Sequence, residues 1–171
     1  MIFGSTDVFA IEIGAIESYP DMCSPYVQFR FWIKKVPIGD WEDRISLIAS
    51  TENARIFCAT EEFRHASRFG QNTPSEIFQR AYDDFFSWDY TKNQMIIPNL
   101  RDRFHLDGIG MGVIQDKYGL VLVESTDGGE RIIAKDLIQE QFIGDVLVSL
   151  GLVESVLRDY IEWGKTQLPA G

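Results

Sequence analysis

Hydrophobic residues fall at every second position along two early segments of the chain. Large apolar side chains recur with this period at 9–13 and again at 27–33. A period of two residues is typical of strands with one buried face. Residues 18–25 between these segments are rich in proline and serine and favour a loop, and Pro37 beyond them suits only an edge position. We expect two antiparallel strands here.

The clearest helix start lies at Thr73. Thr73 can accept a hydrogen bond from the first turn, Pro74 fits the first helical position because its missing N–H would be unpaired there, and Glu76 completes a capping box. The same helical period over 152–161 predicts an amphipathic C-terminal helix. After Glu76, apolar residues at helical spacing predict a stripe that packs on the core: Ile77, Phe78, Ala81, Tyr82 and Phe85.

Weaker patterns complete the predicted fold. Asp40 is placed to cap a helix that would carry Ile45 and Ile48. Apolar residues near 104–106, 113–114, 120–123 and 131–134 predict strands, and the Asp-Gly-Gly turn at 127–129 supplies the positive φ values of a hairpin. Strands and helices without strict alternation indicate an α+β fold. We expect one domain, residues 1–171, with a mainly antiparallel sheet packed by two to three helices.

The net charge of the chain limits the classes of ligand that it can bind. The 171 residues include 26 Asp and Glu against 16 Lys and Arg, which gives a formal net charge of -10. Such a charge repels phosphate backbones and anionic lipid and attracts a basic partner, so direct binding to nucleic acid or membrane is disfavoured. The same excess also serves solubility alone in many proteins.

Several carboxylates are grouped closely enough to form a protein-binding patch. Each group could meet a cationic surface, although a solvated face requires the same residues. Trp32 shares the outward period of its strand with Gln28 and Arg30 and could anchor an interface. The candidate acidic residues are Asp40, Glu42, Asp43, Glu61, Glu62, Asp83, Asp84 and Asp89.

The sequence contains few residues that could form a catalytic site. His105 and Asp107 would share one face of a strand and could act as a base with an orienting acid, but a hydrogen-bonded structural histidine fits the pattern as well. The glycines at 108–112 lack the spacing of a nucleotide loop, and we expect a strand after them rather than a helix. We therefore predict no catalytic residue, no metal site and no cofactor.

The first residues carry no basic segment followed by an apolar stretch, as a secretion signal would. Uncharged apolar runs stay short of the 18 or so residues that a membrane helix needs. We expect a cytoplasmic protein.

Three stretches of the sequence resemble one bacterial family. They are the strand-turn-helix segment with Phe29, Phe31–Ile33, Ile38–Asp40 and Ser46–Leu47, the opening Met1–Gly4 with Phe9–Glu12, and the later Glu130–Ile133. Together they are similar to immunity protein family forty-two of polymorphic toxin and contact-dependent growth inhibition systems.

The resemblance implies a small cytoplasmic inhibitor that is not an enzyme. Such a protein would bind the C-terminal domain of its cognate toxin and block the toxin's active site or substrate surface. A nuclease toxin presents a basic face to nucleic acid, which an acidic inhibitor can occupy. Two alternatives stay open: a small hydrolase that uses His105 and Asp107, and a non-catalytic scaffold with a homo-oligomer interface.

Overall fold

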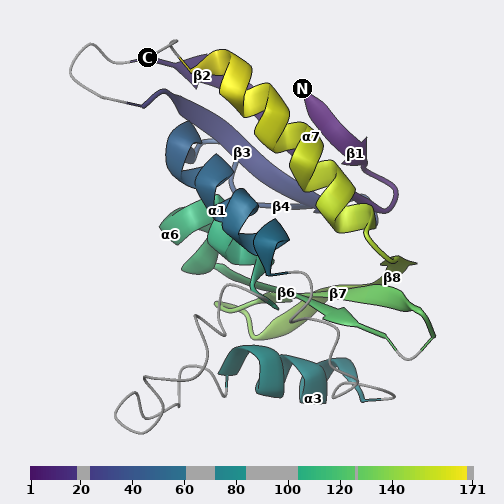
Figure 1. Ribbon diagram of the computed structural model, residues 1–171. Helices are drawn as coiled ribbons and strands as arrows, with labels where there is room; N and C mark the ends of the chain where they lie inside the picture. The colour runs from purple at the N-terminus through teal and green to yellow at the C-terminus, as the bar shows by residue number, and fades with distance from the viewer. Residues whose placement is uncertain (19–23, 61–71, 84–103, 126, 169–171) are drawn as a thin grey trace, which may run out of the picture.

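Two antiparallel sheets and several helices form the α+β fold of this protein (Figure 1). The computed structural model describes residues 1–18, 24–60, 72–83, 104–125 and 127–168. The first sheet has the order β1 (Ile2–Ser5), β2 (Phe9–Glu17), β3 (Tyr26–Ile33) and β4 (Val36–Ile38), and β5 (Arg44–Ser46) also pairs with β3. The second sheet has the order β6 (Tyr118–Glu124), β7 (Gly129–Asp136) and β8 (Gln141–Ser149).

The helices lie on the inner face of the first sheet and on both sides of the second. Helices α1 (Leu47–Ala59) and α7 (Leu152–Gln167) cover one face of β1–β4, and α3 (Pro74–Phe78) lies below the second sheet (Figure 1). Helix α3 continues as a π-helix over Gln79–Asp83, and a 3-10 helix, Leu106–Gly110, leads into the short α6, Met111–Gln115.

The predicted alternation in β2 and β3 is confirmed. Phe9 pairs with Ile33, Ile11 with Phe31 and Ile13 with Phe29, and these six side chains are buried. Their neighbours along each strand point to the opposite face, because successive side chains alternate in a strand. Pro37 lies in β4 at the sheet edge, as its missing N–H requires.

In the second sheet, β6 and most of β7 are buried on both faces, which explains their nearly continuous apolar sequences, whereas β8 has many exposed residues. Leu120, Leu122 and Ile132 belong to the main core, together with residues of the first sheet, α1 and α7. Val121 and Ile133 face the other way and pack with α3 and the π-helix. The predicted hairpin at 125–129 joins β6 to β7, with Gly128 at a φ of 79°.

The capping box at Thr73 is present as predicted. Thr73 Oγ1 accepts a hydrogen bond from the Glu76 amide at 3.3 Å, and Glu76 Oε2 accepts one from the Thr73 amide at 2.8 Å. Ile77, Phe78, Ala81 and Tyr82 are buried, and the predicted fifth member of this stripe lies outside the described residues.

Several element predictions were wrong. Asp40 caps no helix: residues 44–46 form β5 on β3, and Ser46 caps α1 instead, with its Oγ accepting from the Ala49 amide at 3.4 Å. The predicted strands at 104–106 and 113–114 are replaced by the 3-10 helix and α6, apart from one bridge between His105 and Val121. Strand β8 was not predicted.

The C-terminal helix α7 buries one charged side chain together with its apolar face. Glu154, in its first turn, is fully buried.

The described part of the chain contains no helix that is both long and apolar enough to cross a membrane.

Candidate functional site

The outer face of the first sheet carries a cluster of paired aromatic and charged side chains, Glu12, Arg30, Trp32 and Trp41, which we call the outer-face cluster. The Arg30 guanidinium lies between two indole rings, 4.7 Å from the Trp32 centroid and 4.3 Å from the Trp41 centroid. Glu12 Oε2 accepts a 2.7 Å hydrogen bond from Arg30 Nε and another of 2.7 Å from Trp32 Nε1. The four side chains therefore hold one another in fixed orientations.

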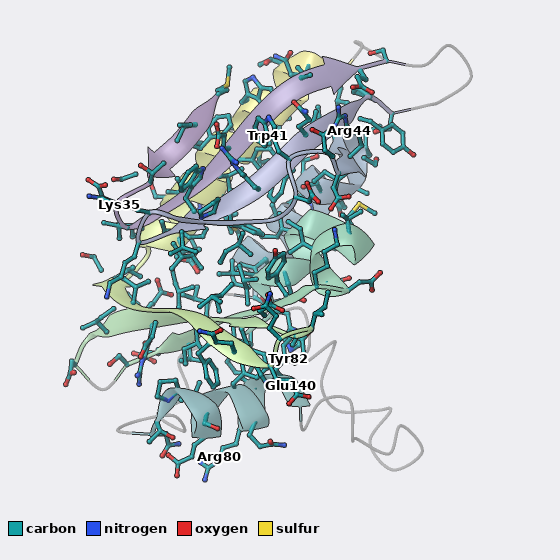
Figure 2. The ribbon with its side chains drawn as sticks, turned by 180° about the vertical axis from the view of Figure 1, so that it is seen from behind. Lys35, Trp41, Arg44, Arg80, Tyr82 and Glu140 are labelled. Atoms are coloured by element: carbon teal, nitrogen blue, oxygen red, sulfur yellow. The ribbon has the colours of Figure 1, made fainter. Side chains whose placement is uncertain are left out.

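The alternation of side chains along β2 and β3 explains why this cluster lies on the outer face. Glu12, Arg30 and Trp32 occupy the positions of β2 and β3 that lie between buried residues, so they point away from the core. Helices α1 and α7 lie on the opposite face, and in the reverse view Trp41 lies over the sheet, with Arg44 nearby (Figure 2). Among the described elements, no helix covers this outer face.

Glu12 is stabilised in its ionised form. Burial alone would raise the pKa of its carboxyl group, but the hydrogen bonds from Arg30 and Trp32 and the Arg30 charge outweigh burial and lower the pKa. Its side chain is 18% exposed and that of Arg30 is 23% exposed. The pair is thus largely desolvated, and the aromatic surface around it bears no net charge from these two groups.

The loop Asp40–Asp43, which we call the acidic loop, is held against this sheet. Arg44 Nη1 donates to the carbonyl oxygen of Glu42 at 2.8 Å, and Gln28 Nε2 donates to that of Trp41 at 3.0 Å. Asp40 Oδ1 accepts the Glu42 amide at 3.1 Å within the loop. These bonds fix the backbone, so the loop presents its carboxylates in one arrangement.

The carboxylates of the acidic loop differ in how much charge they offer to a partner. Lys117 Nζ lies 3.0 Å from Asp43 Oδ2 and 3.9 Å from Asp40 Oδ2. The hydrogen bond that Lys117 donates to Asp43 is the largest cause of a raised Lys117 pKa. Asp43 is therefore largely compensated, whereas Asp40 and Glu42 are exposed to solvent.

The fold brings together candidates that were separate in the sequence analysis. Trp32 meets the acidic loop through Arg30 and Trp41, and the sequence reasoning assigned a site role to neither of these two residues. A signal was available, because Arg30 shares the outward period of Trp32 and Trp41 lies among three carboxylates. The contact between the two tryptophan-bearing segments depends on the course of the loop, which no local pattern reveals.

The other acidic candidates cannot be placed in this site. Glu61, Glu62, Asp84 and Asp89 lie outside the described residues. Asp83 is the last residue of the π-helix, and its side chain is likewise outside the described part.

His105 and Asp107 do come together, although not on a strand as predicted. His105 Nδ1 lies 3.8 Å from Asp107 Oδ1, and the two side chains are 1% and 0% exposed. His105 Nε2 donates to the Ala81 carbonyl oxygen at 2.8 Å, and its ring stacks on Tyr82 with centroids 4.6 Å apart. Asp107 Oδ1 accepts the Leu120 amide at 3.3 Å. The pair thus joins the π-helix, the 3-10 helix and β6.

No group of three or more His, Cys, Asp or Glu within the described ranges has the arrangement of a metal site. Contrary to the predicted strand, the five-residue helix α6 begins within the glycine-rich segment 108–112, at Met111.

Comparison with known proteins assigns the chain to a family. Neither a curated protein nor a solved structure matches the sequence. The family described as Immunity protein 42 matches residues 1–163, which is nearly the whole chain and includes both sheets, α1, most of α7 and the outer-face cluster. The chain therefore belongs to the immunity protein 42 family.

Proposed function

We propose that this protein neutralises one cognate toxin domain by forming a stoichiometric protein–protein complex in the cytoplasm of the cell that makes it. Membership of an immunity protein family supports a toxin-neutralising role and a protein partner. We propose that this toxin is the C-terminal domain of a polymorphic or contact-dependent growth inhibition toxin. Inhibition proceeds by covering the toxin's active site or its substrate surface rather than by turnover.

The outer-face cluster and the acidic loop together form the proposed toxin-binding surface. The observation that carries this assignment is Arg30 held between Trp32 and Trp41 on an uncovered sheet face. Tryptophan and arginine dominate the energetic centres of protein interfaces, and side chains already fixed in place lose little entropy on binding. Asp40 and Glu42 lie beside the cluster as a charged rim.

The net charge of -10 favours a basic toxin. A nuclease is a toxin of this kind, because its substrate surface must attract phosphates. Complementary charge acts mainly on the association rate and on specificity, which suits an inhibitor that must capture its toxin before the toxin acts. Glu61, Glu62, Asp83, Asp84 and Asp89 are proposed as further contributors to this attraction.

A hydrolase that uses His105 and Asp107 is less well supported. Both side chains are almost completely buried, and their hydrogen bonds to Ala81 and Leu120 serve to join secondary-structure elements. His105 Nε2 would have to break its bond to the Ala81 carbonyl oxygen before it could act as a base. We assign the pair a structural role.

The first test is co-expression with the toxic C-terminal domain encoded beside this protein. Rescue of growth and co-purification as a 1:1 complex would support the proposal. Absence of both rescue and complex would contradict it. Light scattering on the isolated protein separates a monomeric inhibitor from a homo-oligomeric scaffold.

The binding surface has its own test in the same assay. Trp32→Ala removes the ring beneath Arg30 and should weaken toxin binding at least tenfold, because central aromatic anchors dominate binding energy. Ser155→Ala on the exposed side of α7 is the matched control and should bind like wild type. Unchanged affinity in a folded Trp32→Ala variant would show that the toxin binds to another part of the surface.

A further inference from the structure

A separate hollow of about 260 Å³ opens between α1 and the segment that contains the 3-10 helix and α6. We call it the α1–α6 pocket. Its walls are formed by described residues of both segments: Asn53, Ile56 and Phe57 of α1, and Met111, Gly112 and Gln115 of α6. None of these residues belongs to the outer-face cluster.

One hydrogen bond links the two walls of the pocket. Asn53 Nδ2 donates a 2.8 Å hydrogen bond to the Gly108 carbonyl oxygen, across 55 residues of sequence. His105 lies at its base and is fixed by its bond to Ala81. Met111, where the 3-10 helix meets α6, has a φ of 58° and a ψ of −167°, a region that residues other than glycine rarely adopt. Strained backbone of this kind is concentrated at binding sites.

The size of the pocket limits its occupant. Drug-sized ligands and cofactors occupy pockets of roughly 300–1,000 Å³. A volume of about 260 Å³ falls below this range and matches one large side chain. An occupant that enters from a protein surface would thus fill it as a single anchor residue.

The lining determines the chemistry of that occupant. Ile56, Phe57 and Met111 offer apolar contact, and the amide groups of Asn53 and Gln115 offer a donor and an acceptor. None of the described residues that line the pocket is Asp, Glu, Lys or Arg. A charged side chain would lose its hydration without gaining an ionic partner there. An aromatic ring with a polar edge, as in tyrosine or tryptophan, matches both kinds of lining.

The surroundings of the pocket place it next to the proposed toxin-binding surface. Ile114 of α6 lies against Gly39, the residue just before the acidic loop. Lys117, just after α6, contacts Asp43 of that loop. Asp116 at the end of α6 is exposed, and Glu52 beside Asn53 is already paired with Arg55. Asp116 therefore adds one exposed carboxylate next to the lining residue Gln115.

We propose that the α1–α6 pocket receives one tyrosine or tryptophan side chain of the toxin domain, flanked on the toxin by basic residues. This inference rests on the proposed function. It makes the pocket a second anchor beside the acidic loop, with α6 between the two. A Tyr or Trp buried in a preformed pocket is a typical energetic centre of a protein interface.

Gly112 offers a direct test of the pocket. A Cβ atom built at this position meets no atom within 4 Å, and its backbone is compatible with any side chain. Gly112→Phe should fill the pocket and weaken toxin binding at least tenfold without lowering the thermal unfolding temperature. Gly112→Ala adds only one methyl group and should bind within about twofold of wild type. Ser155→Phe adds the same ring on α7 and controls for the added apolar surface.

A reciprocal scan on the toxin identifies the occupant. Alanine substitution of each tyrosine and tryptophan of the toxin should reveal one whose loss weakens binding to wild type but adds little to the effect of Gly112→Phe. If Gly112→Phe does not fold, Gln115→Leu removes only the polar group of the wall and should weaken binding several-fold, with the same dependence on one toxin ring.

The outcomes separate this inference from the proposed function. Wild-type affinity in folded Gly112→Phe, or in Gln115→Leu where the first variant does not fold, would overturn the pocket assignment and leave toxin binding intact. Failure of the wild-type protein to bind or neutralise the toxin would overturn both. Equal losses for Gly112→Phe and Ser155→Phe would also contradict the pocket, because they would reflect added apolar surface alone.

Discussion

The Tyr160 hydroxyl donates a 2.9 Å hydrogen bond to Ser50 Oγ, which joins α7 to α1 in the middle of the core. Both residues are fully buried. Close packing accompanies this bond, since a Cβ on Gly164 would lie 2.5 Å from the Thr51 methyl group. The two helices that cover the inner face of the first sheet are thus locked together by one polar bond and a close glycine contact.

We predict that Tyr160→Phe lowers the free energy of unfolding by about 1–2 kcal/mol, because it leaves the Ser50 hydroxyl buried without this partner. Ser50→Ala should have a similar effect. The double variant should lose less than the sum of the two, which urea unfolding of all four proteins would measure. Strict additivity would show that the bond contributes nothing.

The same pair makes stability depend on pH in the alkaline range. Burial raises the pKa of Tyr160 above its ordinary value, and the bond to Ser50 opposes this only in part. The unfolded chain therefore releases the tyrosine proton first, at a pH of about 10, and the stability that Tyr160 contributes falls as the pH rises further. The difference between wild type and Tyr160→Phe should consequently shrink between pH 9 and pH 11.

The parts of the fold that sequence reasoning predicted are those set by local patterns. Alternation identified β2 and β3, because each has one face in the core and one outside. The Thr73 capping box was predicted because all its partners lie within one helical turn. The predictions were wrong where contacts between residues distant in sequence determine the local structure. The pairing of 44–46 with β3 moves the helix start from Asp40 to Ser46.

Only separate parts of the candidate site could be predicted, because contacts between residues distant in sequence bring these parts together. Trp32 and the acidic loop each stand out in the sequence, but Arg30 and Trp41 meet only after the loop folds back over the sheet. His105 and Asp107 were correctly grouped because they are close in sequence. Their role was not evident, since it depends on Ala81 and Leu120, which come from other elements.

Lys34 and Lys35 form the two-residue turn between β3 and β4 with φ values of 47° and 68°. Asparagine and glycine are preferred in such a turn, because they adopt positive φ with little strain. Both lysine ammonium groups make only exposed contacts: Lys34 Nζ donates to the Asp145 carbonyl oxygen at 3.2 Å, and Lys35 Nζ lies 3.5 Å from Asp7 Oδ1. We predict that Lys34→Asn with Lys35→Gly stabilises the fold by about 1 kcal/mol, equivalent to about 2–4 °C in Tm.

The measurement is calorimetric unfolding of the double variant at neutral pH. The backbone amides of both residues donate to the β1–β2 turn, at 3.1 Å to Val8 and 2.7 Å to Thr6, and the substitutions retain these amides. A lower Tm would mean that the lysine side chains stabilise the fold more than their turn geometry destabilises it.

Glu12→Gln should reduce the free energy of unfolding by about 1–2 kcal/mol at pH 7, because it replaces the charged acceptor shared by Arg30 and Trp32. The pKa of Glu12 is lowered in the folded protein, so its contribution is complete above the unfolded pKa and is lost as the pH falls through the folded one. The difference in stability between the two proteins should therefore shrink as the pH falls below about 4.3, the ordinary pKa of glutamate. Glu52→Gln is the control, since its pair with Arg55 is exposed and should have no measurable effect.

The acidic loop supplies the prediction that bears most directly on function. Asp40→Asn with Glu42→Gln changes the net charge from -10 to -8 but retains the side-chain oxygen that accepts the Glu42 amide. We expect the association rate with the toxin to fall about three- to tenfold at low salt, with little change in the dissociation rate, because rim charges act mainly on encounter.

Asp127→Asn with Asp159→Asn removes two exposed charges elsewhere and is the matched control. Stopped-flow measurements at low and high salt distinguish the cases, since screening should remove the difference from wild type. Equal slowing by both double variants would assign the effect to overall charge, whereas slowing by the first alone would place the encounter surface at the acidic loop.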